Sequence, residues 1–421
     1  MVYIVQNAWA LFLGMLLLML GNGLQGSLLA VRGGIEGFNA TMMSLVMSGY
    51  FIGMLFGSLR APWMIRRVGH VRVFAAMASL ISAAFIVYAA VPDPWVWMAL
   101  RVLVGFSFAC VYVVAESWLN DVSTNDTRGQ ALSVYLIVQM AGIIAAQLLL
   151  GVGDPSGYTL FVVISVLVSL SFLPILLSVS AAPVHDTVKR MSLPALYKAS
   201  PLGFVAALAV GAIFGAQFGM GAVYATAKGY SLSELATFVA AIYVGGIIFQ
   251  YPIGFISDRV DRRVLMAVLT TAGALLVGAG AAFANSYAVA LALAVIMGGF
   301  ANPLYSLIIA YVNDYLDHDD MPAAASGLVF LNGVGAFLGP LPVGWLITNV
   351  GPDSYFIFIA MLFAGIAAYA LFRMTQRPAP EAEETAAYVV LHPQSMAVAA
   401  DIAQEVAIDA AGGEEGTEPA G

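Results

Sequence analysis

The sequence has few charged residues for its length. Only 10% of its 421 residues are Asp, Glu, Lys or Arg, whereas 61% are hydrophobic. The mean hydropathy is +0.92. About a quarter of the residues of a soluble domain are charged, so this composition excludes an ordinary soluble protein and indicates an integral membrane protein.

Chemistry-bearing residues are also scarce. The one cysteine, Cys110, excludes an intramolecular disulfide and a cysteine metal cluster. The four histidines, His70, His185, His318 and His392, lie in expected polar connections or the tail, which argues against a histidine relay through the membrane. No glycine-rich loop precedes Lys-Ser or Lys-Thr, and no nucleophile–base pair stands out. We therefore expect no enzyme activity, ATP-driven pumping, cofactor, metal or nucleic-acid partner.

The net charge of −8 is confined to one end of the chain. Residues 374–421 hold nine acids and one base, and the remainder has 15 of each. This tail is rich in Ala, Glu, Gly and Pro, a composition typical of disorder rather than of a packed core. We expect an acidic, disordered tail over 374–421.

Twelve hydrophobic runs reach the roughly 20 residues that a membrane-spanning helix needs. They cover about 8–30, 41–61, 73–91, 95–116, 130–151, 157–178, 201–224, 234–257, 264–283, 287–311, 322–348 and 353–373. The longest internal connection divides them six and six.

The distribution of Lys and Arg predicts the direction of the spans. With the N-terminus in the cytoplasm, the inside connections and the tail collect 13 of the 16 bases, whereas Arg32 and Lys228 fall outside and Arg101 lies within a span. Lys and Arg accumulate in cytoplasmic loops, so we expect both termini in the cytoplasm.

The two halves of the chain repeat at an offset of 192–193 residues. Tyr50 and Gly53 recur as Tyr243 and Gly246, and Gly105 recurs as Gly298. Further matches are Asp126/Asp319, Ser133/Ser326, Gly142/Gly335, Gly151/Gly344, Gln25/Gln217 and Gln139/Asn332. A parallel repeat is the plan of carriers that rock two halves about a central site. We expect an all-α membrane protein with six-helix bundles over 1–180 and 201–373, joined by a cytoplasmic loop over 181–200.

Two basic connections resemble the signature of the major facilitator superfamily, Gly-x-x-x-Asp-Arg-x-Gly-Arg-Arg. "GFISDRVDRR" (254–263) matches it except that Asp261 replaces the second glycine. "PWMIRRVGHVR" (62–72) is the weaker first copy, with Arg66 in place of the aspartate.

Other motifs extend the resemblance over residues 1–373. Arg101-x-x-x-Gly105, "TRG" (127–129) and the "ESWLN" element with "RRVGHVR" are similar to the superfamily and to its poorly characterised YcaD-type branch. The Gly-Pro element that proton-driven drug antiporters carry in helix 5 is missing from "GIIAAQLLLG" (142–151). The resemblance implies a monomeric secondary transporter of the bacterial inner membrane, in contact with lipid, that moves a small molecule by alternating access.

The fourth predicted span carries two charges on one face. Arg101, Gly105, Phe108, Tyr112 and Glu116 are spaced by three or four residues. Charges within a span face the bundle rather than lipid. Arg101 and Glu116 are 15 positions apart, which corresponds to about 22 Å along the helix, so the two cannot pair.

Each charge has a structural and a functional interpretation. Glu116 is either a latch, paired with Arg60, Arg67 or Arg128 or bonded to a neighbouring helix end, or a protonatable group that couples proton movement to transport; the latch is favoured. Arg101 either packs against carbonyl groups or an aromatic ring, or contacts an anionic substrate or a coupling carboxylate.

Amides form most of the remaining polar set inside the spans. Hydrogen bonding between helices explains any single one of them, but in the superfamily helices 1, 4, 7 and 10 line the cavity, with contributions from 5, 8 and 11. The expected substrate-binding residues are Asn22, Gln25, Arg101, Tyr112, Gln139, Gln217, Asn302 and Asn332. Coupling or gating is assigned to Glu116, Arg128, Asp258, Arg259 and Arg262.

The leading hypothesis is a secondary carrier for a small organic solute, with protons as the driving ion and export favoured over import. An importer or a uniporter is the nearest alternative. A carrier-like sensor or scaffold that does not transport, with the acidic tail as its interaction element, is the alternative from another class.

Overall fold

The computed structural model describes residues 2–121, 123–177, 191–376 and 387–415, and every regular element in these ranges is a helix. Much of the expected connecting loop (181–190) and parts of the expected tail (377–386 and 416–421) lie outside the described residues. Twelve helical segments are long and apolar enough to cross a membrane, which confirms the predicted all-α fold.

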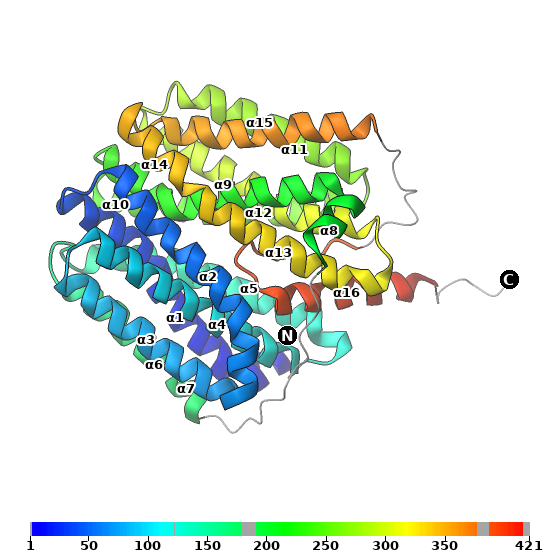
Figure 1. The fold of residues 1–421 in the computed structure, drawn as a ribbon, viewed down its shortest axis with the longest axis horizontal. Helices are drawn as coiled ribbons and strands as arrows, with labels where there is room; N and C mark the ends of the chain where they lie inside the picture. The colour runs from blue at the N-terminus through cyan, green and yellow to red at the C-terminus, as the bar shows by residue number, and fades with distance from the viewer. Residues whose placement is uncertain (1, 122, 178–190, 377–386, 416–421) are drawn as a thin grey trace.

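The helices form two bundles that lie one above the other in Figure 1. The first comprises α1 (Val2–Ile35), α2 (Ala40–Val68), α3 (His70–Ala90), α4 (Pro94–Asp121), α5 (Asn125–Leu149), η1 (Leu150–Val152), α6 (Thr159–Ser171) and α7 (Leu173–Leu177). After the short α8 (Leu193–Ala199), the second comprises α9 (Pro201–Ala227), α10 (Leu232–Ser257), α11 (Arg262–Ala281), α12 (Tyr287–Asn313), η2 (His318–Asp320), α13 (Met321–Leu338), α14 (Pro340–Asn349) and α15 (Ser354–Met374).

Helix pairing repeats between the bundles, as expected of a parallel repeat. The contacts of α2 with α4, α1 with α5 and α3 with α6 recur as α10 with α12, α9 with α13 and α11 with α15. Glycines permit the closest of these approaches: a Cβ on Gly105 of α4 would overlap the Tyr50 carbonyl oxygen of α2, and one on Gly298 of α12 would overlap that of Ile242 in α10. Small residues at such crossings let two backbones touch.

The bundles meet directly at the end of the molecule where α2 begins and α14 lies, here called the Thr41 end. The Thr41 backbone N–H donates to Thr348 Oγ1 at 3.0 Å, and the Thr41 hydroxyl donates to the Gly344 carbonyl oxygen at 3.3 Å. Gly344 packs against Ser44 so closely that a Cβ there would overlap the serine side chain. The helices are therefore closed against each other at this end.

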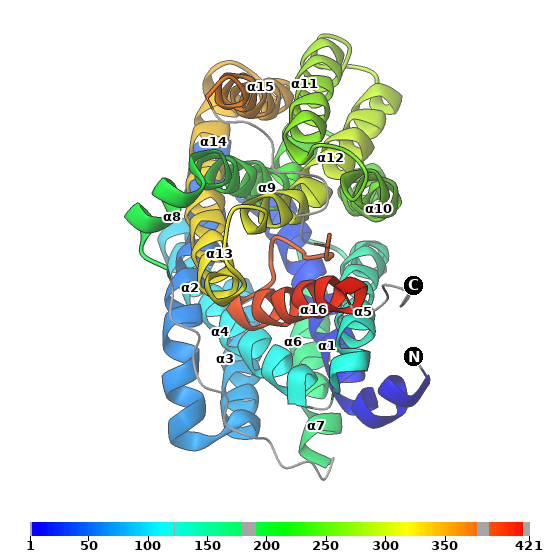
Figure 2. The ribbon, with the colours of Figure 1, turned by 90° about the vertical axis from the view of Figure 1, so that its right-hand side faces the viewer.

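At the opposite end, here called the tail end, the C-terminal segment separates the bundles. Residues 387–396 run between them, and α16 (Ala397–Glu415) lies against α13 on one side and α4 and α5 on the other (Figures 1 and 2). In these residues the structure differs from the expected disordered tail, because many of their side chains are buried.

Gly105 provides a test of this packing. Gly105→Ala should lower the free energy of unfolding by about 1–3 kcal/mol, since the added methyl group forces α4 away from Tyr50. Gly365→Ala in α15 is the matched control, because open space surrounds that position and alanine favours a helix. Thermal unfolding in detergent compares the two; equal stability of both variants would contradict the close crossing of α2 and α4.

Candidate functional site

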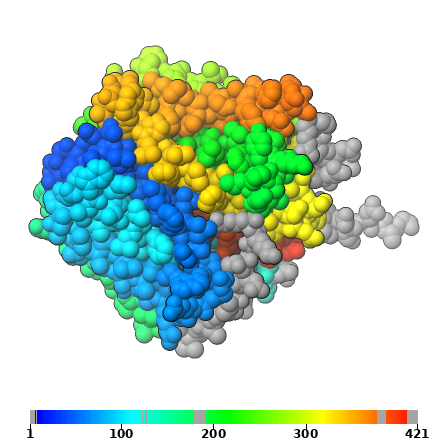
Figure 3. Space-filling view, viewed as in Figure 1, coloured from blue at the N-terminus to red at the C-terminus, as the bar shows by residue number. Residues whose placement is uncertain are grey.

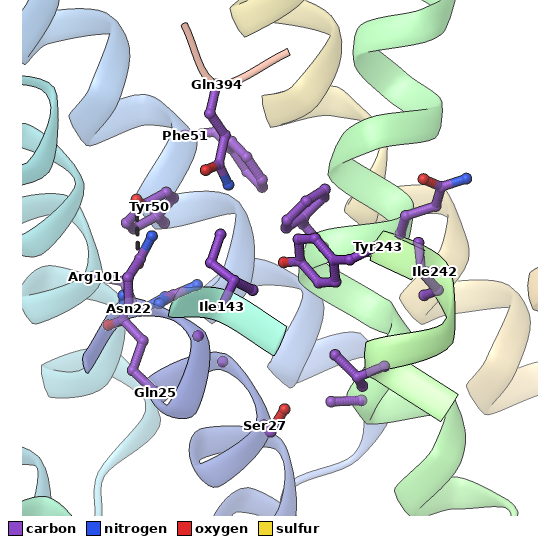
Figure 4. Close-up of a pocket in the computed structure, with 16 residues that line it drawn as sticks. Asn22, Gln25, Ser27, Tyr50, Phe51, Arg101, Ile143, Ile242, Tyr243 and Gln394 are labelled. Carbon is purple, nitrogen blue, oxygen red and sulfur yellow. Dashed lines mark hydrogen bonds between the residues drawn. The ribbon is translucent and has the colours of Figure 1, made fainter. Parts of the chain in front are cut away.

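A cavity lies between the two bundles, and side chains from six helices and the tail line it. It has about 50 Å³ of space open to water, room for a few water molecules. The polar or aromatic lining residues are Asn22, Gln25, Ser27, Tyr50, Phe51, Arg101, Gln217, Phe218, Tyr243 and Gln394 (Figure 4).

Arg101 is the charged residue of this cavity. It is only 4% exposed, and its guanidinium carbon lies 4.8 Å from the centre of the Tyr50 ring. Its Nη2 donates to the Met47 sulfur at 3.4 Å, and its buried Nε has no hydrogen-bond partner among the residues that the structure describes. Within the described part of the chain Arg101 forms no ion pair. A buried cation stabilised by a ring alone is costly, so this position favours an anion.

Helix α1 places two amides beside Arg101. Gln25 Nε2 donates to Asn22 Oδ1 at 2.5 Å, and Asn22 Nδ2 donates to the Tyr112 hydroxyl oxygen at 3.1 Å. The Tyr50 hydroxyl donates to Asn22 Oδ1 at 3.4 Å. Gln25 Oε1 is buried, and no described residue donates a hydrogen bond to it. Asn22 is thus held at the centre of a network, and Gln25 keeps a free acceptor.

The second bundle contributes an amide and aromatic rings. Gln217 Nε2 donates to the Met297 carbonyl oxygen at 3.0 Å, while its Oε1 is buried and has no partner in the described part of the chain. Tyr243 packs edge-on against Phe218 with ring centres 4.6 Å apart. The repeat-related Tyr50 and Tyr243 therefore line the same cavity from opposite bundles.

Not all of the predicted binding residues meet at this cavity. Asn22, Gln25, Arg101 and Gln217 line it, and Tyr112 contacts Asn22. Gln139 is buried but is not among the lining residues, and Asn302 Nδ2 donates to the Gly298 carbonyl oxygen of its own helix at 3.0 Å. Asn332 Nδ2 donates to the Pro393 carbonyl oxygen at 2.8 Å and so binds the tail.

The predicted gating residues of the "GFISDRVDRR" segment form a cluster at the tail end. Arg262 pairs with Asp314, and the two side chains are 2% and 3% exposed. Asp258, which is 44% exposed, lies 3.4 Å from Arg262 Nη2 and accepts from the Tyr388 backbone N–H at 3.0 Å. Arg259 is exposed and covers the Phe255 ring at 3.6 Å. Only Arg262 is therefore fixed by a buried ion pair.

The other two gating candidates bind the tail. Glu116 is fully buried, and its two carboxylate oxygens accept from the backbone N–H groups of Met396 and Ala399 at 2.9 and 3.0 Å. These groups belong to the N-terminus of α16, where helix N–H groups lack partners within the helix and favour an anion. Arg128 pairs with Glu405 of α16. Among the described residues, Glu116 is thus bonded to a helix end and to no arginine.

The tail also contributes residues that the sequence did not indicate as part of a site. Gln394 lines the central cavity, and its buried Oε1 has no partner within the described ranges. His392 is buried against Phe214 and Phe218 of α9, with ring centres 5.7 and 6.0 Å away. Burial lowers the pKa of His392 to about 3, so its imidazole is neutral in this environment.

Comparisons with known proteins agree with this architecture. A family model described as Major Facilitator Superfamily matches residues 11–246 and 202–399. The chain is 28% identical over 338 residues (80% of this chain, 86% of the relative) to an uncharacterized MFS-type transporter of Yersinia pestis (strain Pestoides F). It is 27% identical over 358 residues (84% and 92%) to the uncharacterized MFS-type transporter YcaD of Escherichia coli (strain K12).

Solved structures share the fold at low sequence identity. The nucleoside transporter NupG (D323A mutant) superposes with a TM-score of 0.72 at 14% identity, covering 86% of this chain and 98% of NupG. A bacterial homologue of the human lysosomal transporter Spinster, in an inward-facing and occupied conformation, has a TM-score of 0.69 at 14% identity, covering 90% and 98%.

Two six-helix repeats around a buried polar cavity define a membrane transporter rather than an enzyme. The chain belongs to the Major Facilitator Superfamily, as its motifs suggested. It is a multi-pass protein of the bacterial inner membrane with a small-molecule substrate, and alternating access is the general mechanism of the fold.

The buried ion pair at the tail end has a direct test. Asp314→Asn should lower the free energy of unfolding by about 3 kcal/mol or more, because the buried Arg262 would lose its buried carboxylate partner and keep the more exposed Asp258. Asp258→Asn, which changes the exposed carboxylate at the same arginine, should cost less than about 1 kcal/mol. Unfolding measured side by side in detergent separates them; the reverse order would mean that Asp258 is the main partner.

Proposed function

We propose that this protein is a monomeric secondary carrier that moves a small organic solute with an anionic group by alternating access. The observation that carries the proposal is the buried Arg101, which faces the central cavity without an ion-pair partner among the described residues. An anionic group of the solute would supply the missing charge. A cavity lined by uncharged residues alone would not favour an anionic ligand. The buried charge of Arg101 therefore points to anionic solutes as the substrate class.

The rest of the cavity suits the polar part of such a solute. Gln25 and Gln217 present acceptors without partners from opposite bundles, and Tyr50 and Tyr243 offer amphipathic walls. In alternating access the two bundles rock about the binding site. A solute that is hydrogen-bonded to both bundles would lose part of its bonds when they move apart, and this would allow its release. Tyr112 would act indirectly, by holding Asn22.

We propose that the tail end faces the cytoplasm. The bases counted in the sequence, among them Arg66, Arg67, Arg128 and Arg259, lie at or near this end. Lys and Arg accumulate in cytoplasmic loops, and this bias supports cytoplasmic termini.

For the energy source and direction we propose proton-coupled export. Glu116 supports protons as the driving ion, because it is a fully buried carboxylate within the span Pro94–Asp121. In this arrangement protons reach Glu116 from the tail end only when α16 moves away from it. Export follows by analogy with other carriers of this fold.

The substrate class can be tested in two stages. Thermal-shift measurements on the purified protein should show stabilisation by organic anions and none by matched neutral amides or organic cations. Flux of a stabilising anion into proteoliposomes, with an imposed pH gradient, should then fall at least tenfold in Arg101→Gln and only partly in Arg101→Lys, which keeps the charge.

Arg32→Gln is the matched control, because Arg32 pairs with Glu36 near the Thr41 end and away from the cavity. It should transport like the unmodified protein. Undiminished anion flux in Arg101→Gln would overturn the assigned substrate class. Binding of an anion without any flux would favour the alternative of a carrier-like sensor.

A further inference from the structure

The C-terminal segment occupies the space between the bundles at the tail end. In Figure 2 α16 lies between the upper and lower bundles, and in Figure 3 its red atoms are visible in the crevice between them. The segment packs against α13 of the second bundle and against α4 and α5 of the first. Here the bundles are therefore joined through a third element, in contrast to the Thr41 end, where they touch directly.

The first part of the segment is bonded to the second bundle. The Tyr388 hydroxyl donates to the Pro303 carbonyl oxygen at 3.3 Å and accepts from Gln250 Nε2 at 2.8 Å. The Ser306 hydroxyl bonds both backbone groups of Leu391, at 2.9 and 3.0 Å. These bonds satisfy main-chain groups of an extended segment that would otherwise be buried without partners.

The helix that follows is bonded to both bundles. Asn313 of α12 donates to Gln404 Oε1 at 2.6 Å, whereas Glu116 of α4 receives the N–H groups of Met396 and Ala399. The Glu116 bonds are buried and charge-assisted, and bonds of this kind are about twice as strong as neutral ones. The Arg128–Glu405 pair is partly exposed and contributes less.

The segment reaches the proposed substrate cavity. Gln394 lines the same cavity as Arg101 and Tyr50 (Figure 4). With this residue in place, the space open to water is about 50 Å³, which is too small for an organic solute. The amide of Gln394 therefore occupies a position that a polar group of a solute would take.

We propose that residues 387–415 are an intrinsic plug of the carrier, which closes the solute's route at the tail end and puts Gln394 into the substrate cavity. This inference rests on the proposed transport function. While the plug is bound, α16 lies where α4, α5 and α13 would have to meet for the Thr41 end to open. The plug must leave before solute can enter from the tail end and before the bundles can rock.

His392 adds a contribution to plug binding that is lost in acid. His392 faces Phe214 and Phe218 from α9, and Gln394 donates its backbone N–H to His392 Nδ1 at 3.2 Å. Burial lowers the pKa of His392 to about 3. The contribution of His392 to plug binding is therefore fully present above the ordinary histidine pKa of about 6.5, and it falls by about tenfold between pH 7.5 and 5.5.

The binding of the plug can be measured without knowing the solute. Spin labels on Asp409→Cys in α16 and Arg72→Cys in α3, in a Cys110→Ala background, report the distance between plug and first bundle by double electron–electron resonance. We expect one narrow distance distribution at pH 7.5. Glu116→Gln should raise the population of longer, broad distances about tenfold, because an amide NH₂ cannot accept a backbone N–H.

Matched variants assign the effect to the proposed contacts. Arg128→Gln should release less plug than Glu116→Gln, and Glu36→Gln near the Thr41 end should release none. Lowering the pH from 7.5 to 5.5 should release less plug in His392→Gln than in the unmodified protein, because glutamine keeps a polar side chain but does not titrate. A broad distribution already in the unmodified protein, or one that Glu116→Gln leaves narrow, would overturn the plug.

Transport completes the test. A chain ending after Arg377, which lacks the plug, should carry the anion found by thermal shift at least fivefold faster than a chain ending after Glu415, which keeps it. Equal rates would overturn the regulatory role. If no solute is transported by either chain while the resonance data show a bound plug, the transport function fails and the intramolecular contact stands.

Discussion

The carboxylate of Glu116 meets the N-terminus of α16 inside the protein, and the closed tail end depends on this contact. Removing a carboxylate from water is costly, and the cost is offset here by two N–H groups at a helix end, which also lack partners of their own. The carboxylate and the N–H groups thus provide each other with hydrogen-bond partners. The contact therefore explains both why a charge lies within a span and why a tail of modest hydrophobicity enters the protein.

Arg101 and Glu116 lie on the same helix, but their charges are stabilised in different ways. Glu116 accepts hydrogen bonds from within the chain, whereas Arg101 has a ring and a sulfur atom as neighbours, and its Nε–H has no partner among the described residues. One charge is thus used to hold the protein's own segment, and the other remains available at the cavity. The tail links the two, because Gln394 reaches the cavity that contains Arg101.

The spans, the repeat and the family could be predicted from the sequence, because they depend on long hydrophobic runs and on residues that recur at a fixed offset. The order of the tail could not be predicted from its average composition. Its acids are concentrated at its two ends, and residues 387–408 contain only Asp401 and Glu405, with 15 of 22 residues hydrophobic. A shorter window would have revealed this apolar segment, but not that its helix end binds a carboxylate 280 residues earlier.

The candidate site could be predicted only in part. Helical spacing placed Arg101 on an inward face, and the repeat singled out Gln25 and Gln217. The sequence pattern did not distinguish amides that line the cavity from amides that bond their own helix or the tail, such as Asn302 and Asn332. That difference depends on depth along each helix and on the rotamer, which a single sequence does not specify.

Hydrogen exchange at the N-terminus of α16 tests the central claim most directly. In the intact protein at pH 7.5, the amides of Met396 and Ala399 should be protected, and Glu116→Gln should speed their exchange by an order of magnitude or more while leaving the spans unchanged. Exchange of these amides at the rate of an unprotected peptide in the unmodified protein would contradict the account.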